Sequence, residues 1–369
     1  MAVAAMHVVV GAGIAGLSVA WDLLRQGARV TLVAPHVPGR AGSSVAATGY
    51  LEPRPGKGRM HRLERRALFA WPDWISPIDR TTEYRFQPLH GGRQIKVARA
   101  GEVERLERDL KHREAEGWQV ERIDCEELRR RRPGLAPDIV LAARIDAFRT
   151  FDPVATCRAL GAAVEAKGAR MVVGTARAIE GAAVRLVDGT VVSGDTIVLA
   201  CGAGAADIEG TPDDTPALRT VRGASLVFPM DRDLTDEPMW KHAQGHLCPR
   251  GHAWVAGASF EHGETSPVVD DAVAHDLRAK AASVLPELSE RPFESRVGWR
   301  VHTIDGGLAL RRSAHEPRVW FSLGHGGVGF LRAPVTASLL AQAILADGPD
   351  DPVAAADAAG RLEDPLAGR

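Results

Sequence analysis

The 369-residue sequence predicts a two-domain α/β protein in which a buried parallel sheet alternates along the chain with an antiparallel sheet. Three observations predict this fold. A glycine-rich turn joins two apolar strands near the start, two later apolar strands also end in glycine, and the region between them alternates short strands and turns. A single core stops growing at roughly 250–300 residues, so a chain of this length is expected to divide into two domains.

Composition excludes several classes of protein. The hydrophobic content of 45% excludes disorder. The 46 Lys and Arg against 47 Asp and Glu give a formal net charge of −1, so no overall field attracts nucleic acid or anionic lipid. The four cysteines form no CxxC pair, which disfavours a zinc site, a disulfide framework and a dithiol redox centre. We therefore expect no metal and a reducing, cytoplasmic setting.

The uncharged run from Ala2 to Trp21 has the length of a signal peptide or a membrane span. It lacks a basic n-region, and Gly11, Gly13 and Gly16 interrupt it. A buried strand, turn and helix explain the run better, and we expect no membrane span elsewhere in the chain.

The first motif is a strand, a glycine-rich turn and a helix. Met6 to Val10 is a short, mostly apolar run, Gly11 to Gly16 reads GAGIAG, and apolar residues from Leu17 onward recur at helical spacing. Ala28 to Val33 forms a second apolar strand, which completes a βαβ unit. The three glycines permit a tight turn, close approach of a pyrophosphate, and close packing of helix on strand. The unit predicts a dinucleotide site with its phosphates at the helix N-terminus.

The second strand departs from this pattern at its end. An Asp or Glu normally holds the ribose hydroxyls there, whereas this sequence has Ala34, Pro35 and His36. His36 or a backbone group could substitute, although an exposed loop histidine is the simpler interpretation. Arg40 is a candidate contact to phosphate or adenine, with a solvated loop arginine as an equal alternative.

Three later segments indicate which dinucleotide binds. Gly42 to Leu51 is rich in small residues and leaves room for a flat ring against the backbone, with a flexible loop as the alternative. Asp195 to Gly204 is a buried strand that ends in glycines. Val319 to Leu323 leads into Gly324 to Gly329, and a helix is expected from about Ala333 to Ala346 with Pro334 in its first turn. A chain that returns repeatedly to the nucleotide domain favours FAD over a diffusible nicotinamide.

Taken in order, these segments resemble the glycine oxidase and D-amino acid oxidase family of FAD-dependent amine oxidoreductases. The resemblance covers roughly residues 5–346 and rests on VVVGAGIAGLSVA, SSVAATGYL, FDPVATCRALGAAVEAKGARM, TIVLACGAG, LCPRGHAWVAGASFE, VGWRVHTIDG and SLGHGGVGFLRAPVTASLLAQAI. It implies an FAD-binding Rossmann-like domain of the glutathione reductase type, interleaved with an antiparallel-sheet substrate domain. The FAD-binding domain is expected at 5–85, 150–218 and 303–346, the substrate domain at 86–149 and 219–302, and a flexible tail at 347–369.

The resemblance and the glycine pattern together give an expected set of cofactor contacts. These are Gly11, Gly13, Ile14, Ala15, Gly16, Arg40, Ser43, Ser44, Ala46, Ala47, Gly49, Ala200, Gly202, Gly326, Gly327, Val328, Gly329, Phe330 and Leu331. The amides of Gly326 to Leu331 open a helix, so they offer fixed positive potential to a reduced flavin. Val45 and Ala46 stand where a histidine could attach the flavin, and no cysteine lies in Gly307 to Leu323, so FAD is expected to be noncovalent.

The expected substrate contacts are Arg300, His246 and Tyr50. Arg300 matches the arginine that binds the substrate carboxylate in glycine oxidase, and a guanidinium can hold a carboxylate through two parallel hydrogen bonds. Its alternative is a structural salt bridge. His246 stands in the place of a substrate-contacting tyrosine, or is a hydrogen-bonded histidine on a sheet face. Tyr50 falls beside the expected flavin.

The sequence also departs from the family. The chain has only two tyrosines, and Gly327 replaces a second substrate-contacting arginine, so glycine itself becomes a doubtful substrate. Arg332 stands at a usually apolar position, where it could meet substrate, flavin or solvent. His325 is expected to be structural. Candidate pocket walls, with core packing as the default, are Trp240, His242 and Phe260.

The resemblance implies hydride transfer from the Cα of an amine or amino acid to flavin N5, which gives an imine, with molecular oxygen as acceptor. Three alternatives remain: a dehydrogenase with a quinone or protein acceptor, a tRNA-modifying amine oxidoreductase, and a noncatalytic flavin-binding protein. The tRNA alternative rests on a basic segment for which a solvated helix face is the simpler interpretation: Arg54, Lys57, Arg59, Arg62, Arg65 and Arg66. The amine, its chirality and the oligomeric state stay open.

Overall fold

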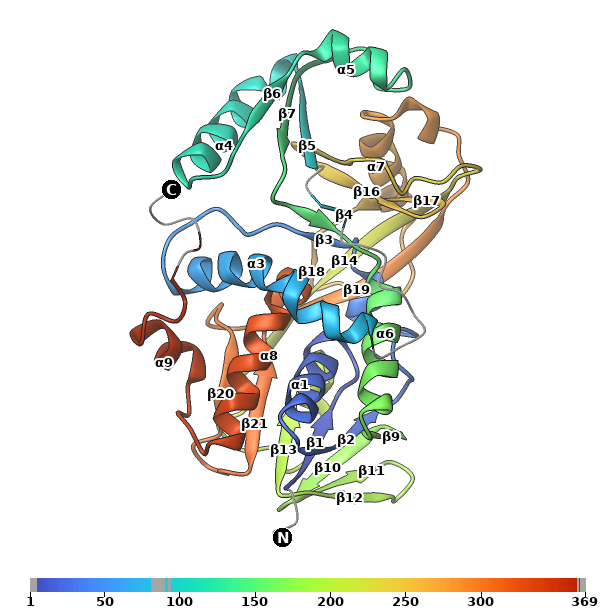
Figure 1. Cartoon of the computed structure of the whole chain (residues 1–369). Helices are drawn as coiled ribbons and strands as arrows, with labels where there is room; N and C mark the ends of the chain where they lie inside the picture. The colour runs from blue at the N-terminus through green and yellow to red at the C-terminus, as the bar shows by residue number, and fades with distance from the viewer. Residues whose placement is uncertain (1–4, 81–89, 92–93, 364, 366–369) are drawn as a thin grey trace.

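A computed structural model describes residues 5–80, 90–91, 94–363 and 365 of the chain (Figure 1). Two large sheets dominate these residues, one six-stranded and mostly parallel, the other nine-stranded and mostly antiparallel. They occupy the lower and upper halves of Figure 1. The mixed α/β class predicted from sequence is confirmed, whereas the predicted domain boundary between residues 85 and 86 lies outside the described residues.

The six-stranded sheet contains the glycine-ended strands of the sequence. Its order is β20 (Ala309–Arg312), β21 (Val319–Leu323), β13 (Thr196–Leu199), β1 (Met6–Val10), β2 (Arg29–Ala34) and β9 (Arg170–Val173). All neighbours pair in parallel except β20 with β21. The predicted βαβ unit and both later strands of the same sheet are therefore present. Every element of this sheet falls within the predicted FAD-binding segments.

The apolar runs follow from a sheet covered on both faces. Val9 of β1 packs in one core with α1 (Ile14–Arg25), α6 (Pro153–Ala166) and α8 (Gly329–Leu345). Its neighbours Val8 and Val10 point the other way, to a core shared with the three-stranded sheet β10 (Ala176–Glu180), β11 (Ala183–Leu186) and β12 (Val191–Ser193). The hairpin of β11 and β12 thus covers one face of the parallel sheet and is not part of the nine-stranded antiparallel sheet.

Helix α8 begins earlier than its sequence predicts. It starts at Gly329, after the short 3₁₀ turn η4 (Gly326–Val328), so Pro334 lies inside the helix and not in its first turn. Proline has no N–H to donate to the carbonyl four residues back, which is that of Phe330. The indole Nε1 of Trp71 donates to that carbonyl at 3.0 Å. A side chain of α3 (Arg59–Asp79) therefore supplies the hydrogen bond that the proline removes.

Helix α8 and its preceding turn, Gly326–Leu345, are long and apolar enough to cross a membrane by length and composition. No membrane span was predicted here from the sequence. Within the fold, 67% of the apolar window is buried inside the protein, against α1 and α3. This makes α8 the central core helix of the lower half (Figure 1).

The prediction of a flexible tail at 347–369 is wrong for the part of the tail that the structure describes. Helix α9 (Pro352–Ala358) is capped by Asp351, whose side chain accepts from the amide of Ala354. Val353, Ala356 and Leu362 are buried in the core that contains α8. The many acidic residues of the tail lie around a small apolar face. The polar composition of the segment therefore predicted an exposed tail although this face packs in the core. Residues 364 and 366–369 of the predicted tail lie outside the described residues.

The buried carboxyl group of Asp22, on α1, predicts a pH-dependent stability. Burial raises the pKa of Asp22 to about 6, and its oxygens accept from Trp74 Nε1 at 3.2 Å. The pKa of Asp22 is near 4 in the unfolded chain and about 6 in the folded protein, so between these pH values the folded state binds more protons than the unfolded state. The free energy of unfolding therefore falls by about 2–3 kcal/mol as the pH rises through this interval. Asp22→Asn stays neutral and keeps an oxygen for Trp74. We expect this variant to exceed the wild type in urea-unfolding free energy above pH 6 and to match it at pH 4; an equal difference at both pH values contradicts the assignment.

The nine-stranded sheet forms the upper half. Its order is β18 (Glu261–His262), β14 (Leu218–Pro229), β17 (Ala253–Gly257), β16 (Gly245–Arg250), β15 (Met239–His242), β5 (Gln94–Arg99), β7 (Ile139–Ile145) and β6 (Glu121–Ile123), with β19 (Glu294–Thr303) paired to β14. One face packs on α7 (Asp271–Ala282) and α5 (Cys125–Arg131), and α4 (Val103–Ala115) contacts β5 and β7. The opposite face is the one that approaches the parallel sheet.

Short elements join the two halves. A small sheet pairs β8 (Arg149–Thr150) with β3 (Tyr50–Leu51) and β4 (His90–Gly91). Helix α2 (Ser43–Ala46) contacts both α6 and β19. The chain segment from 42 to 51, singled out in the sequence for its small residues, thus runs between the parallel sheet and the antiparallel sheet.

Candidate active site

The glycine turn after β1 has the close contacts that its spacing predicts. Gly11 adopts φ +116°, and a Cβ there would lie 2.5 Å from the carbonyl oxygen of Ala200. A Cβ on Gly16 would lie 1.9 Å from the carbonyl oxygen of Gly11. Side chains are therefore excluded at both positions, and the N-terminus of α1 is held against the ends of β1 and β13.

The same turn offers backbone donors to an oxyanion. The amide of Ile14 donates to Ser44 Oγ at 3.0 Å, and a Cβ on Gly13 would lie 3.1 Å from that oxygen. A polar oxygen thus sits at the N-terminus of α1, the position that favours phosphate groups. These residues fit the pyrophosphate of FAD.

Glycines also let the segment 42–51 lie directly on the nine-stranded sheet. A Cβ on Gly298 of β19 would lie 2.7 Å from the Cβ of Ala46, and one on Gly257 of β17 would lie 2.4 Å from Cγ2 of Thr48. Ser43 Oγ donates to the carbonyl of Trp299 at 2.6 Å. The predicted flavin segment is therefore fixed at the junction between the two large sheets.

The turn before α8 reaches the same junction. A Cβ on Gly326 (φ +58°) would lie 2.6 Å from the ring of His302, and one on Gly327 would lie 3.4 Å from Cδ of Arg300. The backbone of the predicted flavin-facing turn therefore touches the arginine predicted to bind substrate.

Arg300 is held without a carboxylate partner. Its Nη1 donates to the carbonyl of Ser259 at 3.0 Å, and its guanidinium carbon lies 4.1 Å from the centroid of the Phe260 ring. A Cβ on Gly223 would collide with the guanidinium, so the side chain lies flat over β14. In the part of the chain that the structure describes, Arg300 forms no ion pair. The structural salt bridge considered from sequence is wrong, and a half-buried guanidinium is left free for an external anion.

His246 and Tyr50 pack together beside this site. Their ring centroids are 4.6 Å apart, and His246 Nε2 lies 2.8 Å from Thr48 Oγ1. Burial lowers the pKa of His246 to about 3, so the imidazole is neutral at pH 7. Burial and the charge of Glu52 raise the pKa of the Tyr50 phenol, which stays protonated. Both groups are polar and uncharged, suited to orienting a substrate and not to binding an anion.

A buried charge cluster adjoins the pair and was missed from sequence. Glu52 follows β3 and accepts hydrogen bonds from Lys96 at 3.2 Å, Arg113 at 2.7 Å and Lys241. Burial alone would raise the pKa of Glu52, but the three cations hold it well below its ordinary value. The ammonium of Lys241 lies 5.6 Å from the centroid of the Tyr50 ring. The available signal was strand alternation, which places Lys241 and His246 as direct partners on one sheet face.

Arg332 takes none of the places expected for it. It is buried and pairs with the buried carboxylate of Glu64 on α3, at 2.7 Å from Nη2. Arg54 donates to the same carboxylate. An arginine at this usually apolar position is tolerated because a matching acid lies on the helix packed against α8. His325 accords with a structural role, since its Nε2 lies 3.1 Å from Ser322 Oγ and burial lowers its pKa to about 3.

Other candidates divide between core and surface. Trp240 is buried in the core on the far side of the nine-stranded sheet, so it is not a pocket wall. Phe260 is 70% exposed and stacks on Arg300. Arg40 and His36 are exposed, and no hydrogen bond fixes either side chain among the described residues, so the ribose contact stays a prediction.

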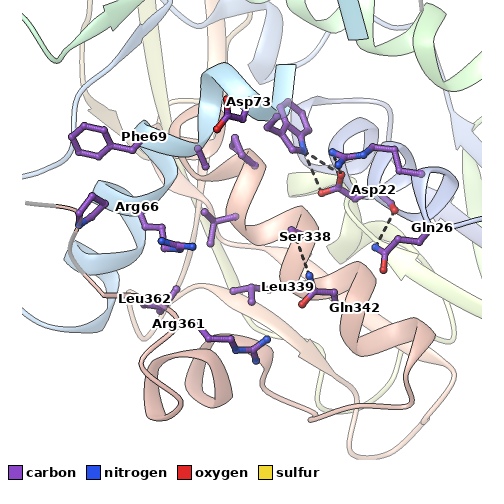
Figure 2. Close-up of a pocket in the computed structure, with 16 residues that line it drawn as sticks. Asp22, Gln26, Arg66, Phe69, Asp73, Ser338, Leu339, Gln342, Arg361 and Leu362 are labelled. Carbon is purple, nitrogen blue, oxygen red and sulfur yellow. Dashed lines mark hydrogen bonds and ion pairs between the residues drawn. The ribbon is translucent and has the colours of Figure 1, made fainter. Parts of the chain in front are cut away.

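A cavity of about 730 Å³ lies elsewhere, between α1, α3, α8 and the segment after α9 (Figure 2). Figure 2 shows Asp22 and Gln26 on one side of it and Arg66, Phe69 and Arg361 on the other. None of the residues predicted to hold flavin or substrate lines this cavity. It is therefore separate from the junction between the sheets where those residues meet.

The fold and the glycine turns at the junction are those of a flavin-dependent oxidoreductase. The family model described as FAD dependent oxidoreductase matches residues 7–343, and the chain belongs to this D-amino acid oxidase (DAO) family. Its cofactor is accordingly FAD, as predicted.

Individual relatives are distant. The chain is 26% identical over 359 residues to the bifunctional protein ThiO/ThiG of Nostoc sp., covering 92% of this chain and 52% of that protein. It thus spans about half the length of the curated relatives it matches first. It is 25% identical to glycine oxidase of Bacillus licheniformis, covering 92% of each chain. The structure of glycine oxidase from Bacillus cereus shares the fold, with a TM-score of 0.83, 18% identity and 99% of each chain covered.

Proposed function

We propose that this protein oxidises the Cα–N bond of an amino acid or a related carboxylated amine, with molecular oxygen as electron acceptor. The observation that carries the proposal is the half-buried guanidinium of Arg300, which has no carboxylate partner among the described residues and lies next to the glycine turn before α8. A carboxylate is the ligand that best matches a planar guanidinium. The relatives named glycine oxidase support an amine as the second recognised group.

The residues divide the work between binding and orientation. FAD, when bound, supplies the hydride acceptor for conversion of the amine to an imine. Arg300 binds the carboxylate and so fixes the Cα–H bond relative to the turn of Gly326–Val328. His246 and Tyr50, both uncharged at pH 7, line the adjoining space and exclude water. Amides at the start of α8 would add positive potential beside a reduced flavin. No general base is required for this division of roles.

Anaerobic reduction of the bound flavin tests the proposal directly. Purified holoprotein is mixed with D- and L-amino acids, glycine and N-methyl amines in the absence of oxygen, and the flavin absorbance is followed. We expect at least one carboxylated amine to bleach the flavin within seconds, and the matching amine without a carboxylate to fail. Hydrogen peroxide should appear in stoichiometric amount when oxygen is admitted; its absence favours a dehydrogenase with another acceptor, and a flavin that no amine reduces indicates a noncatalytic protein.

The tRNA alternative loses its main support in the structure. Arg54 pairs with Glu64, Arg62 pairs with Asp357, and Arg65 is fully buried with its guanidinium 4.4 Å from the Trp118 ring. Basic side chains committed to internal partners are poor phosphate ligands. All four cysteines are free, which fits the cytoplasmic setting that we propose.

A further inference from the structure

We propose that the substrate is an amino dicarboxylate and that Lys241 binds its second carboxylate. This deepens the proposed function and rests on it, since Arg300 is taken to bind the first carboxylate. The proposal has two grounds. Lys241 shares one sheet face with Arg300 and His246, and its one acidic partner among the described residues, Glu52, is shared with two other cations.

The shared face follows from strand register. Lys241 on β15 pairs directly with His246 on β16. His246 pairs with Gly257 on β17, and Gly257 in turn pairs with Ser225 on β14. Direct cross-strand partners point to the same face. Gly223, two residues before Ser225, is on that face too and lies beneath the Arg300 guanidinium. The two cations therefore flank the neutral His246 and Tyr50 pair.

The separation of the two cations suits a short diacid. The Arg300 guanidinium lies over Gly223 of β14, and β14 and β15 are three strand spacings of about 4.8 Å apart. Two charge-assisted hydrogen bonds of about 2.8 Å, one at each end, take up part of that width. The remainder exceeds the length of glycine and leaves room for an amino acid with a carboxylate on its side chain.

The charge cluster leaves Lys241 only partly neutralised. Glu52 carries one negative charge and pairs with three cations, Lys96, Arg113 and Lys241, of which Lys96 and Arg113 also pair with Asp109. Lys96 and Arg113 are 4% and 2% exposed at their side chains, whereas Lys241 is 29% exposed. An ammonium has three donors, and among the described residues Glu52 is the only acceptor for that of Lys241. Lys241 is thus the cation of this group with donors left for a ligand, beside the Tyr50 ring.

Matched pairs of ligands test the role of Lys241 on the holoprotein. Glutarate and glutaramate have the same length and differ by one charge, and their dissociation constants are read from the shift in flavin absorbance that each causes. We expect glutarate to bind at least tenfold more tightly than glutaramate. In turnover, kcat/KM for aspartate or glutamate, of whichever chirality is accepted, should exceed that for asparagine or glutamine by a similar factor.

Variants separate a binding role from a structural one. Lys241→Gln removes the charge but keeps a donor for Glu52, and it should abolish the preference for the acidic member of each pair. Lys280→Gln is the control, because Lys280 is also 29% exposed but lies on α7, which covers the opposite face of the sheet. It should keep the preference.

Each remaining outcome has a definite meaning. Equal affinity for glutarate and glutaramate, or a preference that survives in Lys241→Gln, overturns the inference while leaving the proposed function intact if neutral amino acids reduce the flavin. If the holoprotein binds glutarate selectively but no amine reduces its flavin, the proposed function is contradicted and the dicarboxylate site is still supported.

Discussion

Replacing Arg300 by methionine is expected to lower kcat/KM for the carboxylated amine by about three orders of magnitude, while the protein still binds FAD. Methionine fills similar volume over Gly223 but cannot donate to a carboxylate. Truncating one partner of a buried charged pair typically costs about 2–5 kcal/mol, and about 4 kcal/mol corresponds to the factor of 1,000. Within the described ranges no acid pairs with this guanidinium, so none is left unpaired and the folded state should lose little stability.

Stopped-flow reduction of the flavin under anaerobic conditions provides the measurement. Arg300→Lys keeps the charge but loses the planar fork, and we expect it to fall between the wild type and Arg300→Met. Arg219→Met serves as the control, since Arg219 is an exposed residue on the neighbouring strand β14. Retention of kcat/KM within tenfold in Arg300→Met would show that the carboxylate is bound elsewhere.

The parts of the fold that sequence predicted well are those governed by local chemistry. Strand β1, the glycine turn and α1 follow one another within 20 residues, and each glycine contact is made to the chain nearby or to the adjacent strand β13. The N-cap of α6 is equally local, since Asp152 accepts from the amides of Val154 and Ala155. Such patterns need no knowledge of distant residues.

The predictions that failed depend on partners far away in the chain. Pro334 looked like the first turn of a helix because the donor that replaces its missing N–H, Trp71, lies about 260 residues earlier. Arg332 was given external partners because Glu64 is 268 residues distant. Lys241 was overlooked for the same reason, since its acid Glu52 and the Tyr50 ring come from the other half of the protein.

The chemistry of the site is therefore split between local and long-range information. The residues that hold the cofactor form motifs, because phosphates are bound by consecutive backbone amides. Residues that select a substrate stand singly on separate strands, and only the register of the nine-stranded sheet brings Arg300, His246 and Lys241 to one face. A sequence can thus reveal the flavin more readily than the amine.

The second large effect is expected from adding one methyl group at the glycine turn. In Gly16→Ala the new Cβ would lie 1.9 Å from the carbonyl oxygen of Gly11, a backbone atom that cannot rotate away. Helix α1 must then move off β1, which displaces the Ile14 amide from the phosphate position. We expect the purified protein to contain less than a tenth of the wild-type flavin and to unfold at lower temperature.

Because Gly16→Ala could fail by misfolding, Gly13→Ala provides the sharper measurement. Its Cβ would meet only Ser44 Oγ, at 3.1 Å, a side chain that can turn aside, so the apoprotein should keep the wild-type circular dichroism spectrum. The methyl group nevertheless occupies the space where a pyrophosphate approaches the backbone, and FAD affinity should fall by one to two orders of magnitude when titrated by flavin fluorescence. Gly134→Ala, with nothing within 4 Å of its Cβ, should bind FAD normally. If Gly13→Ala also binds FAD like the wild type, the phosphates do not rest on this turn, and the cofactor must enter the junction in another orientation.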